Sequence, residues 1–144
     1  MKTKTKVLVT AAGGDFAQSV IKALRLSGHP YEIFTCDLTR ESVAQVFGDH
    51  YAVVPKTSDK TYLSKIEQFT QKHKIEAVIP CSEAEIRNLS RLHPELPSGA
   101  ALICQPWDWI ETYGDKLSCF ESLNGKIKIA GYADGKNSKE ISKL

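Results

Sequence analysis

The segment that most constrains this chain is Lys6 to Gly28, where an apolar run leads through a glycine-containing turn into an amphipathic stretch. Val7-Leu8-Val9 has the character of a buried strand, and Thr10 to Asp15 that of a tight turn. The apolar residues that follow have helical spacing and are Phe16, Val20, Ile21, Leu24 and Leu26. The segment therefore predicts the opening strand–turn–helix unit of a parallel sheet.

Two adjacent glycines, Gly13 and Gly14, join this strand to its helix. Glycine adopts positive φ readily, and it lets a ligand approach the backbone near N–H groups suited to an anion. The alternative is that the glycines only make a tight connection and bind nothing. A dinucleotide would be held poorly, because Ala11 and Ala17 stand where a Thr-Gly-x-x-Gly-x-x-Gly fingerprint requires glycine.

The composition is that of an ordinary single globular domain. The 144 residues carry a formal net charge of only +2, which gives no case for nucleic-acid or membrane binding. No apolar run has the length of a signal peptide core or a membrane span, so we expect a cytoplasmic protein. The widely spaced cysteines predict reduced, mostly buried thiols and no metal site; they are Cys36, Cys81, Cys104 and Cys119.

Strand-like and helix-like segments alternate along the rest of the chain. Further strands are predicted at Tyr31–Cys36, Tyr51–Val54, Glu76–Pro80 and Ala100–Cys104. Helices are predicted near 43–47, after a cap at Ser58 or Asp59, from Glu83, around Trp107 to Ile110, and over 116–123 behind an Asp115 cap. This order predicts a three-layer Rossmann-like α/β fold, with about five parallel strands and helices on both faces.

The last twenty residues have a weaker pattern. Ile127, Ile129 and Tyr132 alternate like a brief strand, and 138–144 begins a capped helix that is cut off within two turns.

Asp37 follows the second predicted strand, about 20 residues after the glycine turn. A dinucleotide-binding fold places an acidic residue there to contact a ribose hydroxyl. Capping of the turn at Leu38 to Arg40 explains Asp37 equally well.

A second group of polar residues follows the fourth predicted strand. Ser82 and Glu85 have the spacing of a capping box, which would begin a helix. The same turn lies at the carboxyl edge of the predicted sheet, where open α/β sheets bind ligands. Glu83 and Glu85 are therefore candidate ligand-binding residues as well.

The order of these motifs resembles the front of ATP-grasp ligases, in particular those similar to the large subunit of carbamoyl-phosphate synthase. The resemblance covers residues 5–124, and its motifs are Val7 to Gly14, Cys36-Asp37, Tyr51 to Pro55, Val78 to Glu85 and Gly114-Asp115-Lys116. It implies a pre-ATP-grasp domain at 1–124, followed at 125–144 by a linker and the start of an ATP-grasp domain.

In such ligases ATP phosphorylates a carboxylate, and a nucleophile then displaces the phosphate with the help of Mg²⁺. The resemblance implies that the substrate, a small carboxylate, is bound near Gly13, Gly14, Asp15, Asp37, Ser82, Glu83 and Glu85. It also implies that Lys116 points toward nucleotide phosphate, with an exposed surface lysine as the alternative. ATP and Mg²⁺ are expected for the complete enzyme only, because the remaining ATP-grasp residues would lie beyond Leu144. The expected partner is that downstream domain, and a homodimer is left open.

The chain departs from the family pattern after residue 124, where the usual Gly-x-Pro-x-Pro-like segment has no counterpart. A rival hypothesis is a small NAD(P)-binding protein that resembles short-chain reductases. Val9 to Gly13 and Asp37 favour this rival, and the incomplete glycine pattern disfavours it.

Overall fold

The computed structural model describes residues 3–142, which divide into two compact units. The first unit is Met1–Pro106 and the second is Trp107–Leu144. Each is described by itself below. The domain boundary expected at residue 124 stays a prediction.

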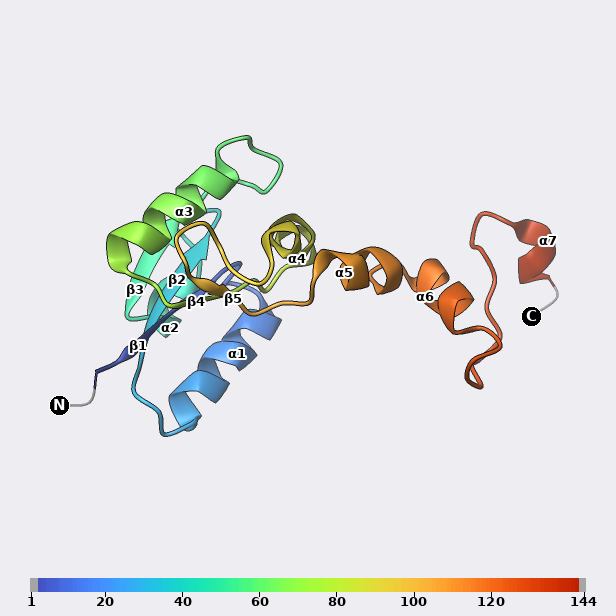
Figure 1. The fold of residues 1–144 in the computed structure, drawn as a ribbon, viewed down its shortest axis with the longest axis horizontal. Coiled ribbons are helices and arrows are strands. Elements are labelled where there is room, and N and C mark those ends of the chain that lie inside the picture. The colour runs from blue at the N-terminus through green and yellow to red at the C-terminus, as the bar shows by residue number, and fades with distance from the viewer. Residues whose placement is uncertain (1–2, 143–144) are drawn as a thin grey trace. The chain divides into compact units, whose positions relative to one another are not determined.

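The first unit alternates strands and helices, as the sequence predicts (Figure 1). Its strands are β1 (Thr5–Val9), β2 (Tyr31–Asp37), β3 (His50–Val53), β4 (Ala77–Ile79) and β5 (Ala101–Leu102). Its helices are α1 (Asp15–Leu26), α2 (Ala44–Phe47), α3 (Tyr62–His73), α4 (Glu83–Leu89) and the 3₁₀ turn η1 (Ser90–Leu92).

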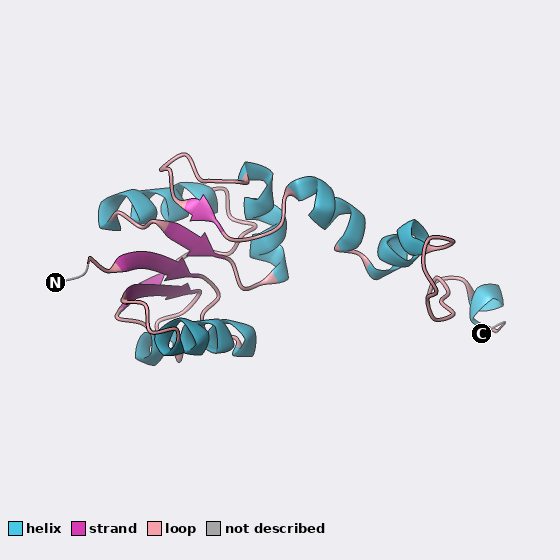
Figure 2. Cartoon of the chain, turned by 60° about the horizontal axis from the view of Figure 1, so that its bottom comes forward, coloured by secondary structure: helices cyan, strands magenta, loops and turns pink. Residues whose placement is uncertain are grey.

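The five strands form one parallel sheet in the order β3-β2-β1-β4-β5. This confirms the predicted Rossmann-like α/β class. Figure 2 shows the sheet between layers of helices. The strand order reverses between β1 and β4, and in doubly wound sheets ligands bind at the carboxyl edge beside such a reversal.

Alternate side chains of β1 enter two separate cores, because successive strand residues point to opposite faces. Leu8 packs with α3 and α4 through residues such as Tyr62, Ile66 and Leu89. Val7 and Val9 pack with α1 and α2 on the other face, in a cluster completed by Ala12, Ala17, Ile21, Ile33 and Ala44. Helices therefore cover both faces of the sheet.

Two of the apolar residues with helical spacing in α1 point to solvent. Phe16 is 63% exposed and Leu26 is 76% exposed, whereas Ala17 and Ile21 are buried. Each residue of a helix is rotated by about 100° from the last, so the face centred on Ala17 and Ile21 excludes Phe16.

Helix α3 begins later than predicted, after Thr61, whose N–H donates to Asp59 Oδ1 over 2.8 Å.

The second unit contains α5 (Trp107–Tyr113), α6 (Lys116–Leu123) and α7 (Ser138–Ile141). The predicted cap is confirmed, since Asp115 Oδ1 accepts from Ser118 N over 3.0 Å. The brief strand predicted at 127–132 is wrong, because the described residues of this unit contain no strand to pair with it. Tyr132 stacks on Phe120 instead, with ring centroids 5.1 Å apart. None of the helices described within 3–142 has the length and apolar character to cross a bilayer.

The glycine turn after β1 differs from the prediction in which residue takes positive φ. Ala11 does so, at 47°, whereas Gly14 has φ −78° as the residue before α1. Gly13 is required for another reason. A Cβ at Gly13 would lie 2.4 Å from Asp37 Oδ2 and 2.7 Å from Ser42 Oγ, too close for either oxygen to stay in place.

We expect Gly13→Ala to lower the free energy of unfolding by about 1–3 kcal/mol, because the new methyl group must displace the hydrogen-bonded Asp37 carboxylate. Gly14→Ala is the matched control, since its Cβ would meet only Ala11 O at 3.5 Å. Urea denaturation of both variants measures the difference. Equal losses would show that the Asp37 contact does not set the requirement for Gly13.

Candidate functional site

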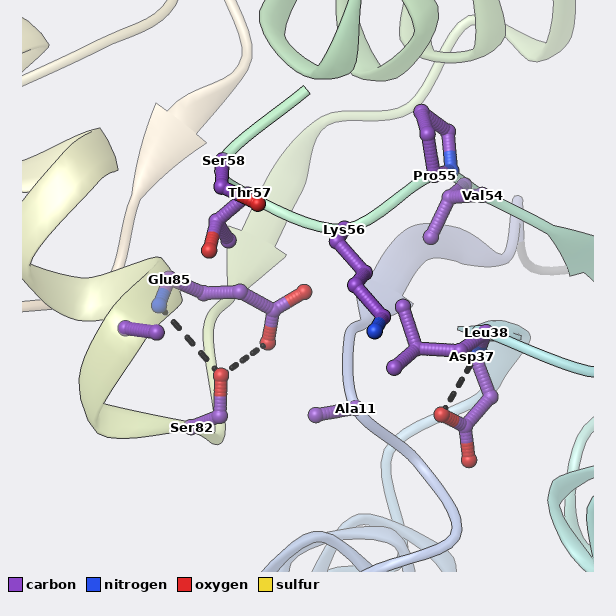
Figure 3. Close-up of a pocket in the computed structure, with 11 residues that line it drawn as sticks. Ala11, Asp37, Leu38, Val54, Pro55, Lys56, Thr57, Ser58, Ser82 and Glu85 are labelled. Carbon is purple, nitrogen blue, oxygen red and sulfur yellow. Dashed lines mark hydrogen bonds between the residues drawn. The ribbon is translucent and has the colours of Figure 1, made fainter.

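A cavity of about 270 Å³ lies at the carboxyl edge of the sheet in the first unit (Figure 3). Residues that follow β1, β2, β3 and β4 contribute to its wall. The polar lining consists of Asp37, Lys56, Thr57, Ser58, Ser82 and Glu85. The apolar lining consists of Ala11, Leu38, Val54, Pro55 and Ala84. The topology thus brings together parts of the chain that are far apart in sequence.

Asp37 holds the glycine turn against the end of β2. Its Oδ2 accepts from Gly13 N over 2.9 Å and from Ser42 Oγ over 2.6 Å. Its Oδ1 accepts from Leu38 N over 2.8 Å, which is the turn cap that the sequence offered as an alternative to a ribose contact. Internal donors therefore occupy both carboxylate oxygens.

Glu85 is a buried carboxylate held by hydroxyl groups from three parts of the fold. Its Oε2 accepts from Thr10 Oγ1 over 2.9 Å and from Ser82 Oγ over 2.8 Å. Its Oε1 accepts from Tyr62 OH over 2.9 Å. The predicted capping of α4 is confirmed, because Ser82 Oγ also accepts from Glu85 N.

Burial and the Glu85 charge change the acidity of neighbouring groups. Burial, followed by Glu85, raises the pKa of the Tyr62 hydroxyl, so that this group stays protonated and donates. The same two causes raise the pKa of Cys36 well above its ordinary value and that of Cys81 to about 12. These thiols are therefore poor nucleophiles at neutral pH.

Lys56 extends from the β3–α3 loop into the cavity, between Glu85 and Leu38 (Figure 3). Two hydrogen bonds fix this loop: Asp59 N donates to Lys56 O over 2.9 Å, and Asn88 Nδ2 donates to Thr57 O over 3.1 Å. Among the described residues, the Lys56 ammonium has no hydrogen-bond or ion-pair partner.

The structure separates the predicted site residues into two groups. Asp37, Ser82 and Glu85 line the cavity. Glu83 is exposed and accepts from Arg87 Nε over 3.2 Å on the surface of α4. Gly13, Gly14 and Asp15 belong to the same turn as Ala11 but do not line this cavity. Their assignment to substrate binding stays a prediction.

Lys116 lies in the second unit, as the first residue of α6. It lines a different cavity of about 380 Å³, together with Asp115, Phe120, Tyr132 and Asp134 among others. Its assignment to nucleotide phosphate stays a prediction. Within residues 3–142, no group of His, Cys, Asp and Glu side chains could hold a metal ion, so no site for Mg²⁺ is assigned to them.

Sequence reasoning missed Lys56, Thr10 and Tyr62. Lys56 could have been found, because it lies in the loop after the third strand and topology places such loops at the ligand-binding edge. Thr10 also follows a strand, but nothing in the sequence pairs Thr10 or Tyr62 with Glu85, from which they are 75 and 23 positions away.

A doubly wound parallel sheet with a cavity at its carboxyl edge defines a Rossmann-like domain. Residues 7–100 match the model of the family described as PylC-like, N-terminal domain. The chain therefore belongs to the PylC-like N-terminal domain family. This family is a pre-ATP-grasp class, which confirms the ATP-grasp ligase resemblance at the level of the domain. A comparison with curated proteins found no match.

Solved structures support the fold over nearly the whole chain. N5-carboxyaminoimidazole synthetase from Staphylococcus aureus, complexed with ADP, has a TM-score of 0.66 at 16% identity, over 99% of this chain and 35% of that chain. The biotin carboxylase domain of Hydrogenobacter thermophilus 2-oxoglutarate carboxylase has a TM-score of 0.64 at 22% identity, over 99% and 32%. The chain thus spans about a third of the length of each.

The NAD(P)-binding rival is the weaker hypothesis. Asp37, its proposed ribose ligand, is engaged by Gly13, Ser42 and Leu38. A Tyr-x-x-x-Lys spacing, typical of short-chain reductases, does occur at Tyr132 and Lys136. These two residues lie in an irregular segment, not on the helix that would bring positions i and i+4 to one face.

We expect Thr10→Val to lower the free energy of unfolding by about 1.5–3 kcal/mol, because it removes a donor from a buried charge while keeping the side-chain shape. Thr35→Val is the control: Thr35 is equally buried, but its hydroxyl donates to the uncharged carbonyls of Ala44 and His50. Urea denaturation should give a smaller loss, about 0.5–1.5 kcal/mol, for the control. A larger loss in the control would contradict the assignment of Glu85 as a buried carboxylate.

Cys81 should react slowly and with a distinctive pH dependence. In the folded chain we expect its alkylation by iodoacetamide to rise about tenfold per pH unit between about pH 8 and pH 10, because the thiolate fraction grows without levelling off below a pKa of about 12. In the urea-unfolded chain the rate should reach half of its maximum near about pH 8.5, the ordinary thiol pKa, and level off above that pH. Mass spectrometry of the Cys81 peptide measures both, and a plateau near that pH in the folded chain would contradict the shift.

Proposed function

We propose that this chain is the substrate-side domain of an ATP-dependent ligase of the ATP-grasp type. In the complete enzyme, ATP activates a small carboxylate as an acyl phosphate, and an amine or similar nucleophile then displaces the phosphate. Family membership over residues 7–100 supports this proposal, together with a cavity at the sheet edge where such folds bind ligands.

The observation that carries the proposal is the wall formed by Asp37, Ser82 and Glu85. Asp37 and Glu85 fix the loops after β2 and β1 through internal hydrogen bonds, and this leaves the cavity shaped before a ligand enters. Preformed geometry of this kind favours correct positioning of two reactants, which is the main demand of acyl-phosphate chemistry. Gly13, Gly14, Asp15 and Glu83 are proposed to contribute at the margin of this site.

ATP and Mg²⁺ are proposed to be held mainly by an ATP-grasp domain, on the same or a separate polypeptide. When bound, they supply the phosphoryl group and neutralise its charge. Lys116, at the start of α6, is the residue of this chain proposed to face nucleotide phosphate. Four free cysteines suit a reducing compartment, and we propose the cytoplasm.

Phosphate release tests the proposal. The 144-residue chain should release no phosphate from ATP above the uncatalysed background, because the groups that hold ATP and Mg²⁺ belong to the partner domain. The protein read from the same frame through the codons that follow Leu144 should release phosphate when a carboxylate and an amine are supplied. ATP hydrolysis by the 144-residue chain alone would contradict the proposal. The proposal would also be contradicted if no ATP-grasp segment restored phosphate release to this chain.

The same sample tests the rival directly. Titration with NADH and NADPH, followed through the fluorescence of Trp107 and Trp109, should give no saturation in the micromolar range. Saturable quenching would favour the NAD(P)-binding hypothesis.

A further inference from the structure

The cavity contains two carboxylates and one ammonium, and their hydrogen-bonding states differ. A carboxylate has about four acceptor positions. Three at Asp37 are used by Gly13, Leu38 and Ser42, and three at Glu85 by Thr10, Tyr62 and Ser82. The ammonium of Lys56 has three donors, and none has a partner among the described residues. Of the three charged groups that line the cavity, the exposed Lys56 ammonium is therefore the one without an internal partner among the described residues.

The backbone that carries Lys56 is held before any ligand binds. Val54 N donates to Asp37 O over 2.9 Å on one side of Lys56, and Asn88 Nδ2 donates to Thr57 O over 3.1 Å on the other. Pro55, directly before Lys56, further limits the backbone. Lys56 is exposed to solvent, and its side chain lies along the wall of the cavity (Figure 3).

We propose that Lys56 is the anchor for an anionic group, a carboxylate or a phosphoryl group, on the ligand of this cavity. This inference rests on the proposed function, because it concerns the same cavity. It assigns recognition of the ligand's negative charge to a residue of the β3–α3 loop. Thr57 and Ser58 follow Lys56 in the same loop, and both also line the cavity.

The remaining wall limits the ligand further. Ala11, Leu38, Val54 and Pro55 present apolar surface, and the cavity holds about 270 Å³. A small anion with a short hydrocarbon body fits this lining better than a highly polar molecule.

Titrations of the 144-residue chain, followed by ¹H–¹⁵N NMR at low salt, test this proposal. The probes are n-butyrate, its neutral analogue butyramide, n-butylammonium and inorganic phosphate. We expect butyrate to shift the amides of Leu38, Lys56 and Ser58 saturably, and butyramide to leave them unchanged. Lys56→Met should weaken anion binding about tenfold or more, since a charge-assisted hydrogen bond is lost.

Lys60→Met is the matched control, because Lys60 is an exposed lysine of the same loop and does not line the cavity. It should change the affinity by less than about twofold, as expected for a distant surface charge. Lys56→Arg, which keeps the charge, should retain binding better than Lys56→Met. The spectra also show whether each variant stays folded.

Binding of either anion that Lys56→Met weakens selectively supports the proposal, and the tighter anion identifies the source as a carboxylate or a phosphoryl group. Three results would overturn it: tighter binding of n-butylammonium than of butyrate, anion binding that Lys56→Met leaves unchanged, or no binding of either anion. The complete ligase could still release phosphate in all three cases, so failure here is distinct from failure of the proposed function.

Discussion

The site depends on the buried carboxylate of Glu85, which forms no ion pair among the described residues. Removing Glu85 from water is costly unless its oxygens are hydrogen-bonded, and Thr10, Tyr62 and Ser82 supply those bonds. The three hydroxyls come from the end of β1, the start of α3 and the cap of α4. The hydrogen bonds to this one carboxylate therefore hold the end of β1, the start of α3 and the start of α4 together beside the reversal in strand order. The cavity wall is built on this arrangement.

Asp37 performs the corresponding task on the other side of the cavity. Its contact with Gly13 N closes the turn after β1 onto the end of β2, and it excludes any side chain at position 13. Acidic residues at the carboxyl edge of the sheet, such as Asp37 and Glu85, are readily interpreted as ligand contacts. Here most of their acceptor capacity is directed inward, which makes them supports of the wall and leaves the basic residue, Lys56, facing the cavity.

The fold alone does not distinguish this domain from other Rossmann-like proteins, since one scaffold supports many activities. The distinction comes from departures within the first turn. Ala11 takes a left-handed conformation in place of a fingerprint glycine, and the carboxylate after β2 is bonded to the turn and not left open to a ribose. Together with the family match, these details favour a pre-ATP-grasp role over dinucleotide binding.

The sequence by itself determined the strand and helix order, the parallel sheet and the caps at Ser82 and Asp115, because periodicity and capping are local properties of the chain. It did not indicate that Phe16 faces solvent, because the direction of the buried face depends on packing against the sheet. It failed for 127–132, where a strand needs a partner. Only the tertiary structure decided that Thr10 meets Glu85 and that Lys56 enters the cavity. Such contacts join residues far apart in sequence, and pairwise hydrogen bonding over that separation leaves no periodic signal to detect.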